Sequence, residues 1–90
     1  MPITVKLPTI LRTHAGGAPV VEANGGTLRE VLADLDARFP GLTDRVRRDG
    51  GLSRFVNVYV NEEDARHLGA LEAPIAEGDT VSIIPAVAGG

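Results

Sequence analysis

The 90-residue chain has no cysteine, no tryptophan and only three aromatic residues in all. The absence of cysteine excludes a disulfide framework, a thiolate metal site and a thiol nucleophile, and it leaves the redox compartment unspecified. A single domain of this length buries somewhat over ~60% of its unfolded surface, so it can hold a modest core without covalent links.

Long apolar runs are missing too. No segment approaches the roughly 20 apolar residues of a membrane span, and Met1 to Leu7 alternates apolar and polar residues, unlike a signal peptide. Twelve acidic and nine basic residues give a net charge of −3, which argues against a nucleic-acid partner. We expect a soluble, cytoplasmic protein that binds neither nucleic acid nor membrane.

Catalytic motifs are also lacking. His14 and His67 show no metal-ligand spacing, and neither Ser53 nor Ser82 lies in a nucleophile-elbow pattern. Lys6, the single lysine, belongs to a strand and not to a phosphate-binding loop. We therefore predict that the chain is not an enzyme, holds no metal and binds no cofactor of its own.

The amino-terminal third predicts two strands joined by a loop. Residues Ile3–Pro8 alternate with one apolar face, and Thr9–Arg12 extends this apolar-mixed pattern. His14–Gly17 is typical of a turn, and Val20–Ala23 resumes as the second strand.

One helix follows, with clear start and stop signals. Thr27 and Glu30 form a capping-box pattern, and Pro40 with Gly41 ends the helix at about Phe39. The apolar residues fall on one stripe, which predicts a core-facing side: Leu28, Val31, Leu32, Leu35 and Phe39.

Residues Leu42–Arg48 indicate one or two further helical turns. They carry the only basic cluster of the chain, Arg45, Arg47 and Arg48. We interpret this cluster as a solvated helix end, with a docking patch as the alternative.

The strongest strand signal is Phe55–Val60. Its three valines share one face, which should pack on the helix, while Phe55, Asn57 and Tyr59 share the other. If that second face is exposed, Phe55 and Tyr59 are candidate contact residues for a partner, since aromatic residues are enriched at interfaces. The alternative is that loops cover them.

The remaining elements are an acidic turn at Asn61–Asp64, a short strand within Ala65–Leu71, a tight turn at Glu77–Asp79 and a last strand at Thr80–Ile84. One helix between two groups of strands predicts an α+β fold, a mixed sheet of four to five strands packed on one main helix. The first and last strands should be parallel neighbours in its centre.

The chain ends in a slim arm, Ala86–Gly90, after Pro85. Proline has no N–H, so sheet pairing should stop at Pro85 or be confined to one edge. We expect a domain at residues 1–85 and a flexible Gly-Gly tail at residues 86–90, mobile because nothing in it can pack or pair. Such an arm suits delivery of its terminal carboxylate into another protein's active site, because glycine passes narrow channels. The alternative is a frayed terminus.

Three segments carry a resemblance to the β-grasp, ubiquitin-like sulfur carriers of the ThiS/MoaD family: Val58–Asn61, Gly78–Pro85 and Ala86–Gly90. The opening Leu7–Arg12 and the segment Arg54–Asn61 resemble most the CysO-type branch, which serves cysteine biosynthesis in actinobacteria.

This resemblance implies a mechanism. A ubiquitin-activating-like enzyme would use ATP to adenylate the Gly90 carboxylate, and sulfide or a persulfide would convert it to a thiocarboxylate. Ala86, Val87, Ala88 and Gly89 would thread into the partner sites. The acceptor would be a pyridoxal-phosphate (PLP)-dependent cysteine synthase, and a zinc metallopeptidase would release the cysteine.

Other functions stay open at this point. The sulfur could instead serve thiamin or molybdopterin synthesis. A ubiquitin-like protein modifier would use the same terminus, although Lys6 and the amino terminus are the only amines for chain formation. A plain interaction module would not need the tail.

Overall fold

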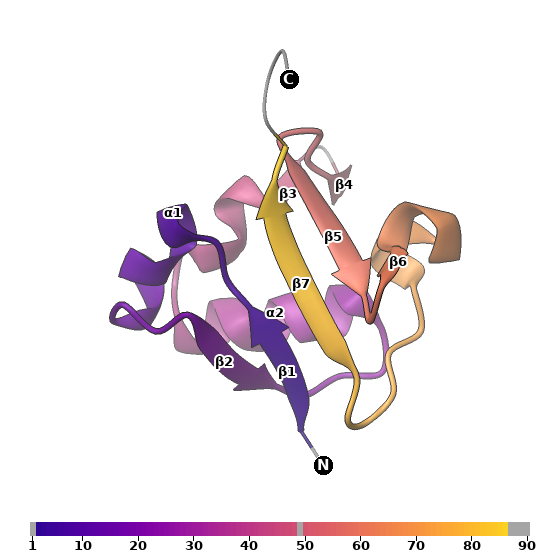
Figure 1. Cartoon of the computed structure of the whole chain (residues 1–90), viewed down its shortest axis with the longest axis horizontal. Coiled ribbons are helices and arrows are strands. Elements are labelled where there is room, and N and C mark those ends of the chain that lie inside the picture. The colour runs from indigo at the N-terminus through magenta and orange to yellow at the C-terminus, as the bar shows by residue number, and fades with distance from the viewer. Residues whose placement is uncertain (1, 49, 87–90) are drawn as a thin grey trace.

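The computed structural model describes residues 2–48 and 50–86. A five-stranded sheet, a two-stranded ribbon, two α-helices and four short 3₁₀ helices make up this part of the chain (Figure 1). In chain order the elements are β1 Ile3–Lys6, α1 Thr9–Arg12, η1 Thr13–Ala15, β2 Val20–Ala23, α2 Leu28–Arg38, η2 Leu42–Arg45, β3 Arg47–Arg48, β4 Gly51–Leu52, β5 Val56–Val60, β6 Glu63–Asp64, η3 Ala65–Leu68, η4 Ala70–Glu72 and β7 Thr80–Pro85.

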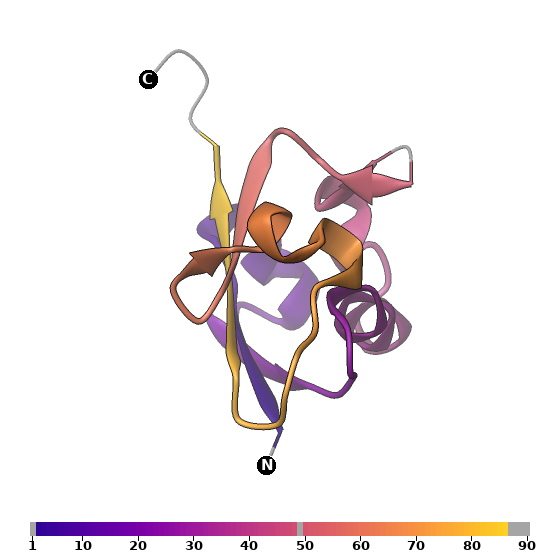
Figure 2. The same cartoon turned by 90° about the vertical axis from the view of Figure 1, so that its right-hand side faces the viewer.

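The main sheet has the strand order β2-β1-β7-β5-β6. The central pair β1 and β7 is parallel, with Val5 opposite Val81, and the other three pairs are antiparallel. This is the α+β architecture that the sequence predicts, with the first and last strands as parallel neighbours in the centre. Figure 2 shows the sheet edge-on with α2 on one side of it.

Helix α2 has the capping that its sequence predicts. The Thr27 hydroxyl accepts a hydrogen bond from the Glu30 N–H at 3.2 Å, and the Glu30 carboxylate accepts one from the Gly26 N–H at 2.7 Å. The helix ends at Arg38, and Gly41 then adopts a φ of +87°, a left-handed conformation in which a side chain would be strained.

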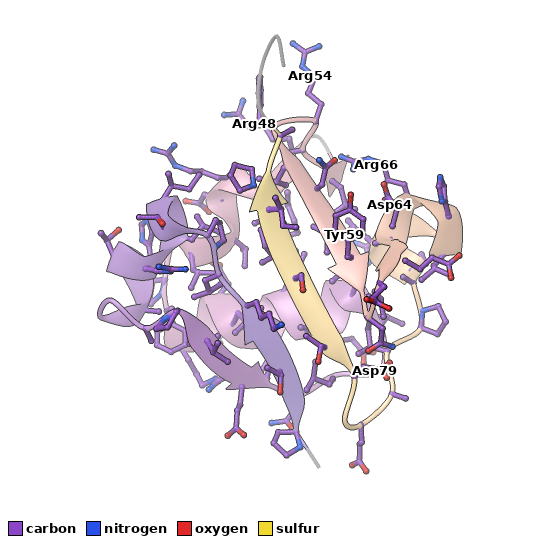
Figure 3. All side chains as sticks on the ribbon, in the orientation of Figure 1. Arg48, Arg54, Tyr59, Asp64, Arg66 and Asp79 are labelled. Carbon is purple, nitrogen blue, oxygen red and sulfur yellow. The ribbon has the colours of Figure 1, made fainter. Side chains whose placement is uncertain are left out.

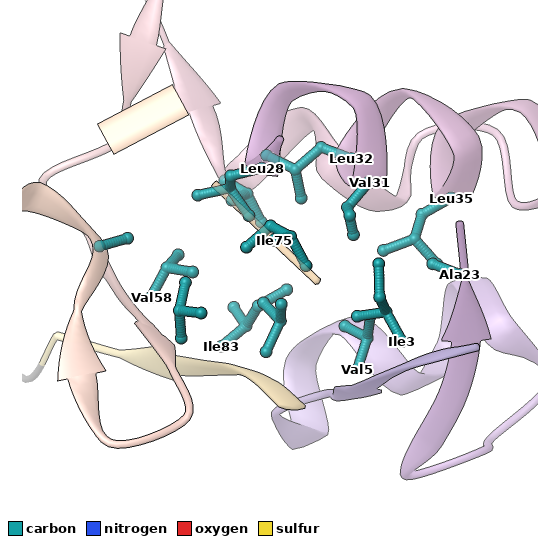
Figure 4. Close-up of a cluster of buried hydrophobic side chains, with 14 of the residues drawn as sticks. Ile3, Val5, Ala23, Leu28, Val31, Leu32, Leu35, Val58, Ile75 and Ile83 are labelled. Atoms are coloured by element: carbon teal, nitrogen blue, oxygen red, sulfur yellow. The ribbon is translucent and has the colours of Figure 1, made fainter. Parts of the chain in front are cut away.

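A single core fills the space between α2 and the sheet (Figure 4). Four residues of the predicted helical stripe are fully buried and Phe39 is half-buried, while the three valines of β5 face inward. The largest fully buried side chains are Ile3, Val5, Leu11, Leu28, Val31, Leu32, Leu35, Leu42, Val46, Val56, Val58 and Val81.

The predicted extension of the first strand is wrong. β1 ends at Lys6, and Thr9–Arg12 forms helix α1. Leu7, Leu11 and Ala15 are buried at intervals of four residues, so the segment packs with a helical period, and Pro8 begins the turn away from the sheet.

Three further predictions change in detail. Leu42–Arg45 is a helical turn as expected, but Arg47–Arg48 pairs with β4 instead of continuing the helix. Residues 65–72 form two 3₁₀ helices and no strand, with Gly69 at a φ of +109° between them. The acidic turn contains the short edge strand β6.

Candidate functional site

Strand β7 extends beyond its neighbour β1 and carries the chain to the end of the sheet. β1 pairs with β7 only as far as Ser82, whereas β5 pairs with β7 as far as Pro85. The Ala86 N–H then donates to the carbonyl of Phe55 at 2.9 Å.

Pro85 fits in this central strand for a geometric reason. Successive residues of a strand direct their N–H groups to opposite neighbours, and Ala86 bonds toward β5. The position of the missing N–H of Pro85 is therefore on the β1 side, where pairing has already ended. This confirms the prediction that pairing at Pro85 is confined to one edge.

The expectation of an unpaired arm from residue 86 onward is wrong for Ala86, which is half-buried and hydrogen-bonded. The remaining tail residues of the sequence prediction, Val87, Ala88, Gly89 and Gly90, lie outside the described residues. The boundary between domain and tail at 85/86 stays a prediction.

Phe55 stands directly beside the point where the tail begins. It is 55% exposed, and the Arg54 guanidinium carbon lies 5.3 Å from the centre of its ring. No loop among the described residues covers it, so the predicted contact residue is exposed on this part of the chain. Its role in docking stays a prediction.

A hydrogen-bond network holds the turn that presents Phe55. The Phe55 N–H donates to the hydroxyl of the buried Ser53 at 3.0 Å. Arg66 donates from one terminal nitrogen to the carbonyls of Ser53 at 2.7 Å and Val56 at 3.2 Å. Arg66 therefore ties the 3₁₀ helix η3 to the start of β5.

Tyr59 lies on the same outer sheet face but farther from the tail. It is half-buried, opposite Ser82 of β7 and Asp64 of β6 (Figure 3). Tyr59 is four residue steps along the strand from Phe55, a distance of about 13 Å. The structure thus places the two predicted contact residues on one face without bringing them together.

Two further apolar side chains are exposed near Phe55. Ile84 is 47% exposed on the outer face of β7, and Ile10 is 48% exposed on α1. Both line a hollow of about 560 Å³ between α1, β1 and the end of β7. We call Ile10, Phe55, Ile84 and the exposed Pro85 the tail-root surface.

Sequence reasoning missed Ile10, Ile84 and Arg66. Ile84 had a signal, because it shares its strand face with Thr80 and Ser82 and is the one large apolar side chain there. Ile10 was missed because the sequence predicted a strand for Thr9–Arg12, which forms helix α1.

The described residues contain no group of three or more His, Asp or Glu side chains that could hold a metal ion. No helix among them is long and apolar enough to cross a membrane. The site is therefore an exposed contact surface next to Ala86, at the end of β7.

A mixed sheet clasping one helix, with its last central strand leading into the carboxyl terminus, defines a ubiquitin-like β-grasp protein. Residues 5–90 match the model of the ThiS family. The chain belongs to this family.

Relatives with known names support the assignment. Over its full length and that of the relative, the chain is 52% identical to the sulfur carrier protein CysO of Mycobacterium tuberculosis. A chain in the crystal structure of the Amycolatopsis orientalis BexX/CysO complex matches with a TM-score of 0.93 at 52% identity, covering 98% of this chain and 99% of that one. Small archaeal modifier protein 1 of Haloferax volcanii matches with a TM-score of 0.78 at 31% identity, covering 96% and 98%.

These findings confirm the predicted fold and the resemblance to CysO-type carriers of the ThiS family. The prediction that the chain is not an enzyme agrees with them, since the CysO relatives are named as carrier proteins.

Proposed function

We propose that this protein is a cytoplasmic sulfur carrier for cysteine biosynthesis, with Gly90 as the sulfur-bearing residue. The observation that carries the proposal is the full-length identity of 52% to a CysO sulfur carrier, with both chains covered completely. The match to the ThiS family likewise extends to residue 90.

The chemistry takes place on the terminal carboxylate in two steps. A ubiquitin-activating-like enzyme transfers AMP from ATP to the Gly90 carboxylate, and pyrophosphate leaves. Hydrosulfide or an enzyme persulfide then attacks the acyl carbon and AMP leaves; a persulfide route also needs a thiol to reduce the resulting acyl disulfide to the thiocarboxylate. The catalysts and the ATP belong to the partner, so the chain needs no cofactor and no cysteine.

The acceptor step uses the thiocarboxylate as a nucleophile. A PLP-dependent cysteine synthase would present an aminoacrylate derived from O-phosphoserine, to which the sulfur adds. Transfer of the acyl group to the new amine leaves cysteine amide-linked to Gly90, and a zinc metallopeptidase hydrolyses that bond.

The structure supports such a delivery by what surrounds the tail. The tail-root surface exposes apolar side chains beside Ala86, which is where an enzyme that receives Ala86–Gly90 must approach. Tyr59 is a second, more distant contact candidate on the same sheet face.

The direct test is the intact mass of the protein after incubation with an activating enzyme, ATP and a sulfur donor. The wild type should gain the mass difference of one sulfur replacing one oxygen, and alkylation should trap the product at the C-terminus. A mass that never changes with any activating enzyme of the source cell, or that changes equally in a chain ending at Ala88, would refute the carrier function.

Gly90→Ala is the finer probe of the same step. A Cβ at the reacting residue displaces the carboxylate, and about 1 Å of misplacement can cost about 10²-fold in rate. The variant should fold as the wild type does and accept sulfur poorly. Equal rates of sulfur loading for the variant and the wild type would mean that the active site of the adenylating enzyme does not require glycine at this position.

A second candidate function is protein modification, because the chain is also similar to small archaeal modifier proteins. It predicts amide-linked adducts between Gly90 and lysines of other proteins in extracts supplied with ATP. A thiocarboxylate that reacts with cysteine synthase and O-phosphoserine, without such adducts, would favour the carrier over the modifier. Genes for thiamin or molybdenum cofactor synthesis next to the gene for this protein would indicate that its sulfur serves those pathways instead.

A further inference from the structure

The arginines of this chain fall into two groups that differ in their partners. Four of the eight are held by hydrogen bonds to other described residues: Arg12 by the Leu7 carbonyl, Arg29 by Glu72, Arg38 by Asp34 and Arg66 by the Ser53 carbonyl. The side chains of the other four form no ion pair or hydrogen bond with the residues at 2–48 and 50–86, and all of them lie within one ten-residue segment: Arg45, Arg47, Arg48 and Arg54.

Three of these arginines surround Phe55. Arg45 and Arg48 line a hollow of about 370 Å³ together with Ile10 and Phe55. Arg54 stacks over the Phe55 ring, and it lines the adjoining hollow with Arg48. We call Arg45, Arg48 and Arg54 the arginine rim. Arg47 is half-buried and lines neither of these two hollows, so it is not part of the rim; it lines a third hollow with Arg29 and Arg48.

The position of the rim is unexpected for a chain with a net charge of −3. Half of the twelve acidic residues lie in the segment from Glu62 to Asp79. Figure 3 shows Asp64 and Asp79 apart from Arg48 and Arg54, which lie at the end of the sheet where β7 stops. Among the described carboxylates, only Asp44 lines the hollow that Arg45 and Arg48 share. Three arginines and one described carboxylate, Asp44, therefore line the hollows at Phe55, which is hydrogen-bonded to Ala86.

We propose that the arginine rim is an electrostatic docking surface, and that the protein partner receiving the tail presents carboxylates around an apolar contact for Phe55 and Ile84. The proposal rests on the proposed function and names the chemistry of the partner at that site. An arginine fork pairs with a carboxylate through two parallel hydrogen bonds, and charges at the edge of an interface mainly raise the association rate.

Two alternatives fit the surface less well. A small anion would leave the exposed apolar side chains of the tail-root surface uncovered. Nucleic acid would be repelled by the acidic residues that dominate the rest of the chain. An acidic protein surface accounts for the apolar centre and the charged rim together.

The test compares two variants with the same change in net charge. Arg48→Gln/Arg54→Gln removes two rim charges, and Ala33→Glu/Ala37→Glu adds two negative charges on the exposed side of α2, opposite its buried stripe. The probe is the purified adenylating enzyme that loads the wild type in the mass assay. Its association rate with each variant is measured by stopped flow at low and high salt.

The rim variant should associate about 5- to 10-fold more slowly at low salt, and the difference should vanish near ~0.5 M salt, where exposed charges are screened. The α2 variant should change the rate much less, because its charges lie away from the docking end. A rim variant with the wild-type rate, or an α2 variant that slows equally, would overturn the proposal.

The outcome separates this inference from the proposed function. If the wild type is loaded with sulfur and the rim variant associates at the wild-type rate, the docking role of the arginine rim is refuted and the carrier function stands. If no adenylating enzyme loads the wild type, both the carrier function and the docking role are refuted. Binding of polyuridylate to the wild type that is lost in the rim variant, with an unchanged enzyme association rate, would reassign the rim to nucleic acid.

Discussion

Truncating Phe55 is the perturbation whose effect follows most directly from the structure. A phenylalanine side chain buries about 200 Å² when fully covered. Phe55 is 55% exposed in the free protein, so about 110 Å² of it remains for a partner to cover. At ~25 cal/mol per Å², covering this area contributes about 2.7 kcal/mol, or about 100-fold in the dissociation constant.

The cost of Phe55→Ala to folding is smaller than the stability of a domain. The buried part of the side chain contributes at most about 2 kcal/mol, against the ~5–15 kcal/mol by which native domains are usually stable. The variant should therefore stay folded, which thermal unfolding followed by circular dichroism would verify.

The assay is the dissociation constant of the complex with the adenylating enzyme, by calorimetry at a salt concentration that screens the arginine rim. Val20→Ala is the control, because Val20 is 46% exposed on edge strand β2, separated from β5 by β1 and β7. Val20→Ala should bind as the wild type does, and Phe55→Ala up to about 100-fold more weakly. Unchanged binding by a folded Phe55→Ala would show that the tail-root surface is not the contact.

Three further changes have defined outcomes. Arg66→Ala should lower the free energy of unfolding by about 1–2 kcal/mol, because the part-buried carbonyls of Ser53 and Val56 lose the Arg66 donor and Ser53 keeps only the longer bond from the Val56 N–H at 3.5 Å. A urea midpoint equal to that of the wild type would contradict this. Thr27→Ala should cost about 1 kcal/mol through the lost cap of α2, measured in the same way, and Thr27→Ser should restore most of it. Tyr59→Ser should weaken binding of the adenylating enzyme less than Phe55→Ala does, since Tyr59 is half-buried and farther from the tail. A larger effect of Tyr59→Ser would show that the main contact lies around Tyr59 and not around Phe55.

Local signals in the sequence were enough for the parts of the fold that depend on neighbouring residues. The cap at Thr27, the stripe along α2 and the stop at Gly41 all act within a few residues, and the structure confirms each of them. The alternation in Phe55–Val60 correctly assigned its two faces, because side chains in a strand alternate whatever the strand pairs with.

Local signals were ambiguous where short segments had no long period. Thr9–Arg12 carries an apolar pattern that fits a strand as well as a helix, and burial of Leu11 in the core accompanies the helix. Arg47–Arg48 left the predicted helix because residues 51–52 offer it a pairing partner.

The sequence by itself determined the carboxyl-terminal Gly-Gly, the strand that leads to it and the family resemblance. Only the tertiary structure decided which side chains surround the end of β7. The tail-root surface and the arginine rim draw on four separate segments, which contribute Ile10, Arg48, Phe55 and Ile84. These segments meet because the chain turns away from the sheet at Pro8, after β1 has ended, while β5 and β7 stay paired as far as Pro85. No local pattern encodes such a meeting, since it depends on strand order and on where each strand stops.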